Sequence, residues 1–269
     1  MCIAKFEQDY LELINRILSQ GVIKQGRNGS TKALFGETLK IDMTDSKEFP
    51  LLHTRKIFHK GIFGEFAAMV RGPSNVADFQ KFDCNYWNNW GDDKGNINVD
   101  YGNLWLDFNG VNQLEEVARK LKETPNDRRI IISGWDPSNL EDLSLPCCHI
   151  LYQWFTRGPY LDMIWYQRSV DTMVGLPSDI VLAAIWNIML ANEVGLAPGE
   201  ITMMLGDTHI YSQHEEGAVQ MLKTRKLIRS YPEYTLSAKP GMPVTEFLPS
   251  MISLTGYNPI QTVKFDLIV

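Results

Sequence analysis

Cysteine is scarce in this sequence, and the few cysteines form no paired framework. Four occur, Cys2, Cys84, Cys147 and Cys148, and no C-x-x-C motif is present. Such usage is typical of a reducing, cytoplasmic setting. Because adjacent Cys-Cys-His residues cannot surround one tetrahedral ion, we expect no metal in the protein.

Long apolar runs and blocks of like charge are also missing. The most apolar stretch, residues 180–191, is too short and too interrupted to span a bilayer, so we expect no membrane partner. The net charge of −6, spread over 22% charged residues, argues against a nucleic acid as substrate. A small anionic ligand stays open, since a few arginines in a pocket bind a phosphate.

Apolar residues make up 44% of the chain, which is enough for a sizeable core. Their spacing predicts helices at residues 4–20, 56–71, 111–122 and 177–194, and strands at residues 129–135, 149–156 and 160–168. Helices and strands do not alternate as they do in a doubly wound fold. We therefore predict an α+β fold in a single domain that spans residues 1–269.

A candidate nucleophile lies just ahead of the predicted strand at 149–156, in the sequence Leu145-Pro146-Cys147-Cys148-His149. A thiolate becomes a strong nucleophile when a neighbouring cation or hydrogen-bond donor lowers its pKa. Two buried, inert cysteines at a strand start are the alternative, which this pentapeptide alone favours.

Three further motifs carry groups that bind anions or hydroxyls. They are Arg168-Ser169 near the end of the 160–168 strand, Arg128-Arg129 ahead of a very apolar strand, and His209 with Tyr211 on one side of an extended segment. Each has an ordinary alternative, namely a surface ion pair, a solvated charge or a core group with a satisfied polar tip.

The order and spacing of these motifs closely resemble the thymidylate synthase family over nearly the whole chain. The matching segments are LPCCH at 145–149, YQRSVD at 166–171, GLP at 175–177 and GDTHIYSQH at 206–214. Further agreement comes at Arg27, Glu65, Trp87, Trp90, YGNLW at 101–105, DRRII at 127–131 and GYNP at 256–259. The loop around Arg27 is one residue shorter than the family pattern.

The resemblance implies a fold and a reaction. Members fold as a single α+β domain around a mixed sheet, and two subunits pair sheet against sheet as a homodimer with shared active sites. They carry a one-carbon unit from 5,10-methylenetetrahydrofolate to C5 of a pyrimidine nucleoside monophosphate. By this analogy Cys148 attacks C6 of the pyrimidine, and Glu65 moves protons near the ring.

The resemblance also implies a role for each matching side chain. The catalytic group comprises Cys148, Glu65, Asp179, Tyr101 and His149. The nucleotide-binding group comprises Arg27, Gln167, Arg168, Ser169, Asp171, Asp179, His209 and Tyr211, with Arg128 and Arg129 contributed by the other subunit. The folate-binding group comprises Trp87, Trp90, Asp171, Val174, Gly175, Ser178 and Val269.

Three residues depart from the family pattern: Ser178 replaces Phe, Asp179 replaces Asn and Cys147 replaces Pro. The family's Asn accepts from N3–H of uracil and donates to O4. Cytosine presents the reverse pattern, which an aspartate that shares one proton with the ring can match. Asp179 therefore points to dCMP, as in the deoxycytidylate hydroxymethylases. An acid favoured by the helix macrodipole is the alternative.

The identity of the product depends on what reaches the exocyclic methylene intermediate. Because Ser178 replaces Phe, the wall of the site that faces the folate lacks an aromatic side chain and can admit water. Addition of this water to the intermediate would give 5-hydroxymethyl-dCMP and tetrahydrofolate. Trp87, Tyr101 and Val269 match the shielding residues of methylating members, so a dCMP 5-methyltransferase stays open. A thymidylate synthase acting on dUMP, a catalytically lapsed nucleotide-binding protein and a cysteine hydrolase also stay open. We expect a cytoplasmic dCMP hydroxymethylase, with a phage-infected cell as one setting.

Overall fold

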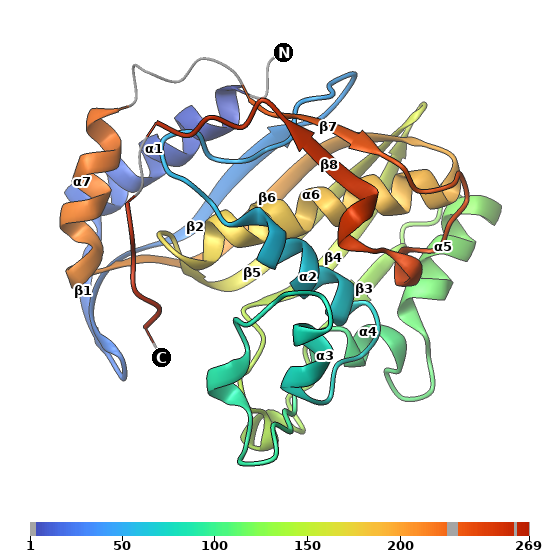
Figure 1. Ribbon diagram of the computed structural model, residues 1–269, viewed down its shortest axis with the longest axis horizontal. Helices are drawn as coiled ribbons and strands as arrows, with labels where there is room; N and C mark the ends of the chain where they lie inside the picture. The colour runs from blue at the N-terminus through green and yellow to red at the C-terminus, as the bar shows by residue number, and fades with distance from the viewer. Residues whose placement is uncertain (1–3, 225–230, 261–262, 269) are drawn as a thin grey trace.

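The computed structural model describes residues 4–224, 231–260 and 263–268. Its strands are β1 (Val22–Gly26), β2 (Gly29–Asp42), β3 (Ile131–Ser133), β4 (His149–Arg157), β5 (Tyr160–Asp171), β6 (Ala197–Tyr211), β7 (Glu233–Leu236) and β8 (Ile252–Thr255). The first six form one sheet in the order β1-β2-β6-β5-β4-β3 (Figure 1), and β7 pairs with β8 in a second. Because β5 and β6 are parallel and the other neighbours antiparallel, the large sheet is mixed, as predicted.

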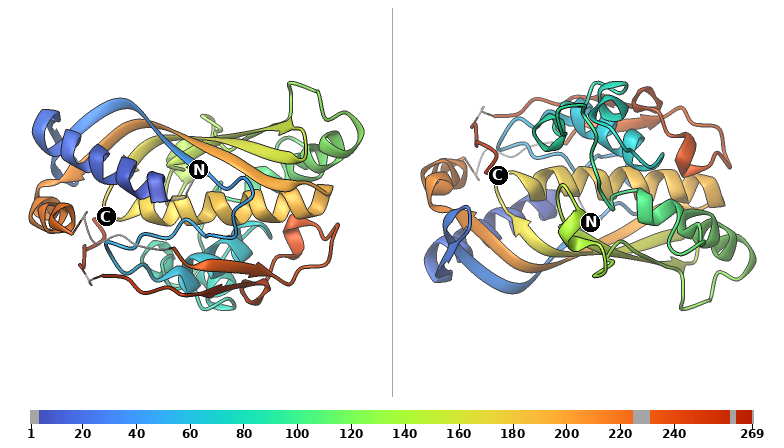
Figure 2. Two further views of the ribbon diagram at one scale, coloured as in Figure 1. Left: turned by 90° about the horizontal axis from the view of Figure 1, so that it is seen from above. Right: turned by 90° about the horizontal axis from the view of Figure 1, so that it is seen from below.

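The helices and the small sheet build two layers over one face of the large sheet. The helices are α1 (Ala4–Gln20), α2 (His59–Met69), α3 (Val76–Gln80), α4 (Asn103–Leu106), α5 (Gln113–Glu123), α6 (Gly175–Val194) and α7 (Glu215–Lys223). Helices α1 and α6 lie directly against the sheet. Figure 2 shows α2 and the β7–β8 pair on the far side of α6. The predicted α+β fold is confirmed.

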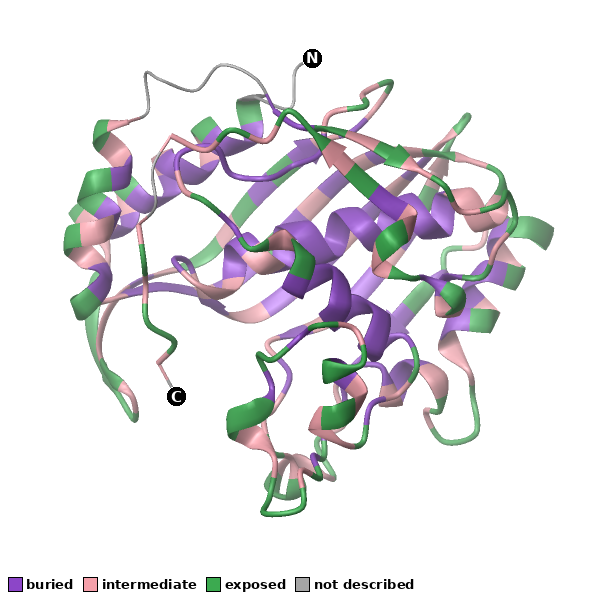
Figure 3. Cartoon of the chain, in the orientation of Figure 1, coloured by how far each residue is buried: buried purple, intermediate pink, exposed green. Residues whose placement is uncertain are grey.

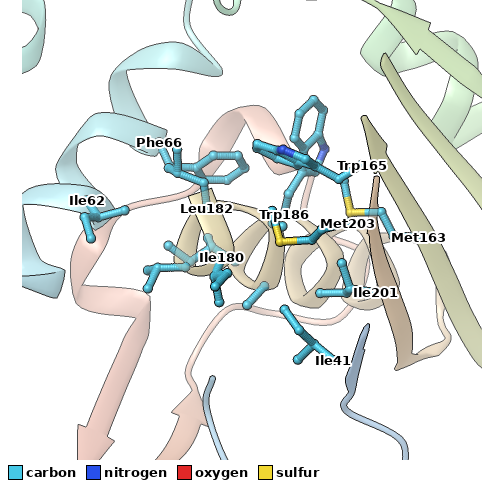
Figure 4. Close-up of a cluster of buried hydrophobic side chains, with 14 of the residues drawn as sticks. Ile41, Ile62, Phe66, Met163, Trp165, Ile180, Leu182, Trp186, Ile201 and Met203 are labelled. Atoms are coloured by element: carbon cyan, nitrogen blue, oxygen red, sulfur yellow. The ribbon is translucent and has the colours of Figure 1, made fainter. Parts of the chain in front are cut away.

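Helix α6 forms the centre of the core. It packs against β5 and β6 on one side and α2 on the other, and Figure 3 shows it buried along nearly its whole length. Its Ile180, Leu182 and Trp186 belong to the apolar cluster in Figure 4. The helix has the length and composition of a membrane span, but 83% of its most apolar window is buried inside the fold. Such burial on all sides is typical of a core helix.

The other face of the large sheet carries exposed apolar side chains. Successive residues of a strand point to opposite faces, so the buried Trp154 of β4 is followed by Phe155, which is 65% exposed. Ile131 of β3 and Met204 of β6 are also exposed. In the described part of the chain, α1 and α6 cover only the opposite face (Figure 2). An apolar sheet face of this kind is typical of a subunit interface.

Most predicted elements are present, with some shifted ends. The helix at 4–20 agrees with α1, and the strands at 149–156 and 160–168 agree with β4 and β5. Strand β3 has only three residues and lies at the edge of the sheet, where it pairs with β4 alone. Helix α6 begins at Gly175, two residues before Pro177, because a proline is tolerated in the first turn of a helix.

Candidate active site

Cys148 lies immediately before β4, in a segment whose backbone is held on both sides. Its amide donates to Tyr101 Oη at 2.5 Å, and its carbonyl accepts from the Arg168 amide at 2.8 Å. The side chain of Cys148 is half-buried, whereas the neighbouring Cys147 is buried. Only the second of the two thiols is therefore presented to a ligand.

The Arg168 guanidinium is fixed beside this segment. Its Nε donates to the Cys147 carbonyl at 2.8 Å and its Nη2 to the Pro146 carbonyl at 3.2 Å. Its Cζ also lies 5.0 Å from the ring centroid of Trp135. These contacts use two of the five N–H groups of the guanidinium and one of its faces. The remaining donors are pre-positioned for an anion.

The charge balance at Cys148 has opposing contributions. Burial, and then the negative charge of Asp179, raise the pKa of the Cys148 thiol, while Arg168 and the Tyr101 hydroxyl act to lower it. Protonation of Asp179 removes this negative charge and with it one of the raising effects. The environment therefore links the reactivity of the thiol to the state of Asp179.

Glu65 is a buried carboxyl on α2, on the side of the site opposite the sheet. Its Oε1 accepts from Trp87 Nε1 at 2.8 Å. Burial raises the pKa of Glu65 to about 7, and the Trp87 hydrogen bond opposes this rise. A carboxyl that titrates near neutral pH suits a general acid–base role.

Asp179 is a second buried carboxyl, in the first turns of α6. Its Oδ2 accepts from Gln167 Nε2 at 2.6 Å, and its Oδ1 lies 3.8 Å from His149 Nε2. Burial raises the pKa of Asp179 to about 8; the Gln167 hydrogen bond opposes the rise, and the charges of Glu65 and Asp171 add to it. At neutral pH this carboxyl is protonated. Its surroundings are therefore those of a hydrogen-bonding acid, unlike a solvated helix N-terminus.

An aromatic chain joins the two carboxyls to the strand that follows Cys148. The Trp87 ring contacts Tyr101 at 5.8 Å between centroids, and Tyr101 contacts His149 at 4.4 Å. Burial lowers the pKa of His149 to about 3, so its imidazole is neutral. All five residues predicted as catalytic, Cys148, Glu65, Asp179, Tyr101 and His149, thus lie within one network.

The predicted sugar-binding residues lie at the end of β6, next to Arg168. Register pairs Ser169 with Asp207 and Asp171 with His209 across the parallel strands. His209 Nδ1 is 3.2 Å from Asp207 Oδ1, and the His209 and Tyr211 rings are 5.2 Å apart. The parallel pairing brings these polar groups from two strands to one edge of the site.

The three remaining arginines of the prediction have different surroundings. Arg27 is exposed in the β1–β2 turn, where it donates to Asn28 Oδ1 at 3.1 Å. Arg128 and Arg129 lie before β3, beside an open hollow of about 640 Å³ lined by residues 123–129. Arg129 pairs with Asp127 at 3.0 Å. Both arginines are exposed.

Four of the predicted folate-binding residues lie at or just before the start of α6, namely Asp171, Val174, Gly175 and Ser178. Asp171 Oδ1 accepts from the amides of Met173 and Val174 at 2.9 and 3.1 Å, which shapes the turn before Gly175. Ser178 Oγ is 3.5 Å from the Val174 carbonyl. Trp90, half-buried, contacts Trp87 at 5.6 Å between ring centroids. Val269 lies outside the described residues.

Three residues that sequence reasoning missed complete the site. Trp135 stacks on Arg168, and Tyr152 contacts both the ring and the carbonyl of His149. Arg55 donates to the Met173 carbonyl and lies 4.7 Å from the ring centroid of Phe265. Aromatic residues are common in strands, so nothing in the sequence marks Trp135 or Tyr152 as part of the site, and only the fold shows these contacts.

A half-buried thiol beside a fixed arginine, in one network with two buried, protonatable carboxyls, suits covalent catalysis on an anionic substrate. The sequence model of the thymidylate synthase family matches residues 8–269, nearly the entire chain. Enzymes of this family use methylenetetrahydrofolate as co-substrate for one-carbon transfer to C5 of a pyrimidine nucleotide. The protein is therefore a one-carbon transferase that belongs to the thymidylate synthase family.

Proposed function

We propose that the enzyme converts dCMP and 5,10-methylenetetrahydrofolate to 5-hydroxymethyl-dCMP and tetrahydrofolate. The observation that carries this proposal is the carboxyl of Asp179, which is buried, faces His149 and takes a hydrogen bond from Gln167. In the family resemblance, this position holds the Asn that reads the edge of the pyrimidine ring.

The chemistry of a protonated carboxyl supports cytosine as the base. Such a group presents one donor oxygen and one acceptor oxygen. It accepts from N4–H of cytosine and shares its proton with N3, two contacts that an Asn side chain in the uracil-reading orientation does not make. Because Asp179 is protonated at neutral pH, the hydrogen-bonded pair of Asp179 and cytosine forms without a buried charge.

The same proton supports a second candidate substrate. A protonated acid with its donor and acceptor oxygens exchanged donates to O4 of uracil and accepts from N3–H. Thymidylate formation from dUMP is therefore the second candidate. The position of the proton on Asp179 decides between the two bases, because mispaired buried polar groups discriminate by about 10⁴-fold.

The proposed reaction begins at Cys148. Its thiolate adds to C6 of the pyrimidine, and the electron pair of the C5–C6 double bond moves to C5. C5 then attacks the folate methylene, and loss of the C5 proton and of tetrahydrofolate leaves an exocyclic methylene. Water adds to that methylene, and the C6–sulfur bond breaks to regenerate the thiolate. Glu65 organises the water and moves protons near the ring.

Binding of the nucleotide involves two chains in this proposal. Arg27, Arg168 and Ser169 hold the 5′-phosphate, and His209 with Tyr211 binds the sugar hydroxyl. By analogy with the family, we assign Arg128 and Arg129, which are both exposed in their own chain, to the neighbouring subunit's site. The homodimer forms through the apolar outer face of the sheet around Phe155 and Met204, and the enzyme acts in the cytoplasm.

The folate is assigned to the space around the start of α6, between the residues that precede it and the tryptophans at 87 and 90. Ser178 is the residue on which the hydroxymethyl product depends. Its hydroxyl is small and polar, so that face of the site can hold a water close to the exocyclic methylene. Addition of water gives the hydroxymethyl group, whereas hydride transfer from the folate would give a methyl group.

Steady-state kinetics with both nucleotides test the proposal. Wild type should turn over dCMP, and Asp179→Asn should lose dCMP and gain dUMP turnover, mostly in kcat/KM. Asp93→Asn is a matched control, since it makes the same chemical change at an exposed position. A wild type that prefers dUMP, or a preference that Asp179→Asn leaves unchanged, contradicts the substrate assignment.

A further inference from the structure

We propose that Tyr152 is a positioning residue that acts through His149 to hold Asp179 in its protonated form. Tyr152 lies on β4, three residues after His149, and both are buried. The effect of Tyr152 on Asp179 does not depend on which nucleotide is the substrate. Its consequence for dCMP binding rests on the function proposed above.

The first step is the tautomer of His149. We assign the only hydrogen of the Tyr152 hydroxyl to the His149 carbonyl, which lies 3.1 Å from Oη and can only accept. The same Oη lies 2.5 Å from His149 Nδ1. In this assignment the hydroxyl hydrogen is used, so Nδ1 donates its own hydrogen to Oη across the short contact. The Tyr152 hydroxyl therefore fixes the imidazole proton on Nδ1.

The second step concerns the other ring nitrogen. A buried imidazole with a pKa lowered to about 3 carries one proton only, so Nε2 is left with a lone pair. That lone pair faces Asp179 Oδ1 at 3.8 Å. A lone pair repels an ionised carboxylate and favours a carboxylic acid whose hydroxyl points toward it. The Gln167 amide already donates to Oδ2, which places the acid proton on Oδ1.

The other groups around Asp179 act in the same direction. The titratable side chains that face this carboxyl are Glu65, Tyr101, Cys148, His149, Tyr152 and Asp171. None of them is a cation at neutral pH, and the charges of Glu65 and Asp171 raise the pKa of Asp179 further. The described surroundings thus contain no positive partner that would stabilise the ionised form.

A pre-protonated Asp179 has a measurable consequence for ligand binding. If the acid already carries the proton that it shares with N3 of cytosine, dCMP binds without taking up a proton from solution. Asp179 should then add no pH dependence to dCMP binding below about pH 7, and affinity should fall as Asp179 ionises near pH 8. A site with an ionised aspartate would bind dCMP only with uptake of one proton.

The test is Tyr152→Phe, which removes the hydroxyl and keeps the ring. Without that acceptor the His149 proton can move to Nε2 and stabilise the Asp179 carboxylate. Infrared difference spectra of the ligand-free enzyme, assigned by subtraction of Asp179→Asn, should show a carboxylic acid C=O band at pH 7 in wild type. We expect this band to be lost in Tyr152→Phe. Tyr10→Phe is the matched control, because Tyr10 is a buried tyrosine that donates to the Thr172 carbonyl without touching His149.

Calorimetry in buffers of different ionisation enthalpy provides the second readout. Wild type should take up no proton on binding dCMP at pH 7, whereas uptake by Tyr152→Phe should approach one. The Kd of the variant should rise tenfold for each pH unit between its new Asp179 pKa and pH 8. A purely structural role for Tyr152 would weaken binding equally at every pH.

The proposal is overturned if the acid band is absent in wild type or persists in Tyr152→Phe. The infrared measurement needs no nucleotide, so it separates this proposal from the substrate assignment. An enzyme that binds dUMP and rejects dCMP would refute the assignment, and the ligand-free spectra would still decide the role of Tyr152.

Discussion

Replacement of Asp179 by Asn should stabilise the protein in a pH-dependent way. Folding raises the pKa of Asp179 from 3.8 to about 8, so between these pH values the folded state binds a proton that the unfolded state has released. The contribution of Asp179 to stability is then greatest below pH 3.8 and is lost as the pH rises toward 8. The Asn side chain is nearly isosteric and takes up no proton, so the variant avoids this loss.

The magnitude follows from the two pKa values. At about 1.4 kcal/mol for each pH unit, proton uptake lowers the free energy of unfolding by about 4 kcal/mol at pH 7 and by about 2 kcal/mol at pH 5. Asp179→Asn should exceed wild type in stability by these amounts. Glu65, whose pKa is about 7, is common to both proteins, so most of its contribution cancels in the comparison.

Urea denaturation of both proteins at pH 5, 6, 7 and 8, at one protein concentration, measures the difference. Asp93→Asn should show no such trend, because that position is exposed. A difference between wild type and Asp179→Asn that stays constant from pH 5 to pH 7 would show that Asp179 does not take up a proton on folding. Asp179 would then not be a protonated, base-reading acid.

Three further predictions concern the reaction itself. Cys148→Ser should abolish turnover and keep nucleotide binding, whereas Cys147→Ser should keep substantial activity, as judged by a turnover assay and nucleotide titration; reversed phenotypes would refute the assignment of the nucleophile. Mixed Arg129→Ala and Cys148→Ser subunits should regain activity in hybrid dimers, and a fully active monomer in sedimentation would contradict shared sites. Glu65→Gln should lower kcat by about 10²- to 10⁴-fold and remove the limb near pH 7 from the pH–rate profile. A pH–rate profile that keeps this limb would refute the acid–base role of Glu65.

Apolar spacing in the sequence predicted several core elements, but it missed others, including strands β2 and β6 of the large sheet. Helix α1 agrees with its predicted range because one face is apolar and the other polar. The β1–β2 hairpin escaped prediction because β1 is exposed throughout and its turn is polar. The β7–β8 pair escaped because four-residue strands carry little periodicity.

The reactive residues could be predicted from motif order, but their electrostatics could not. Cys148, Glu65 and Asp179 were assigned because the motifs around them resemble those of the thymidylate synthase family. Their protonation depends on burial and on partners distant in sequence, such as Trp87 for Glu65 and Gln167 for Asp179. Assignment of Arg128 and Arg129 to a second subunit stays a prediction, since a single chain does not test it.

Mass spectrometry of the product formed from dCMP and 5,10-methylenetetrahydrofolate tests the central claim most directly. We expect 5-hydroxymethyl-dCMP, with an oxygen that comes from labelled water, and tetrahydrofolate as the second product. A methylated dCMP accompanied by dihydrofolate would contradict the role given to Ser178. If dCMP stays unreacted while dUMP is converted to thymidylate, the role given to Asp179 is contradicted.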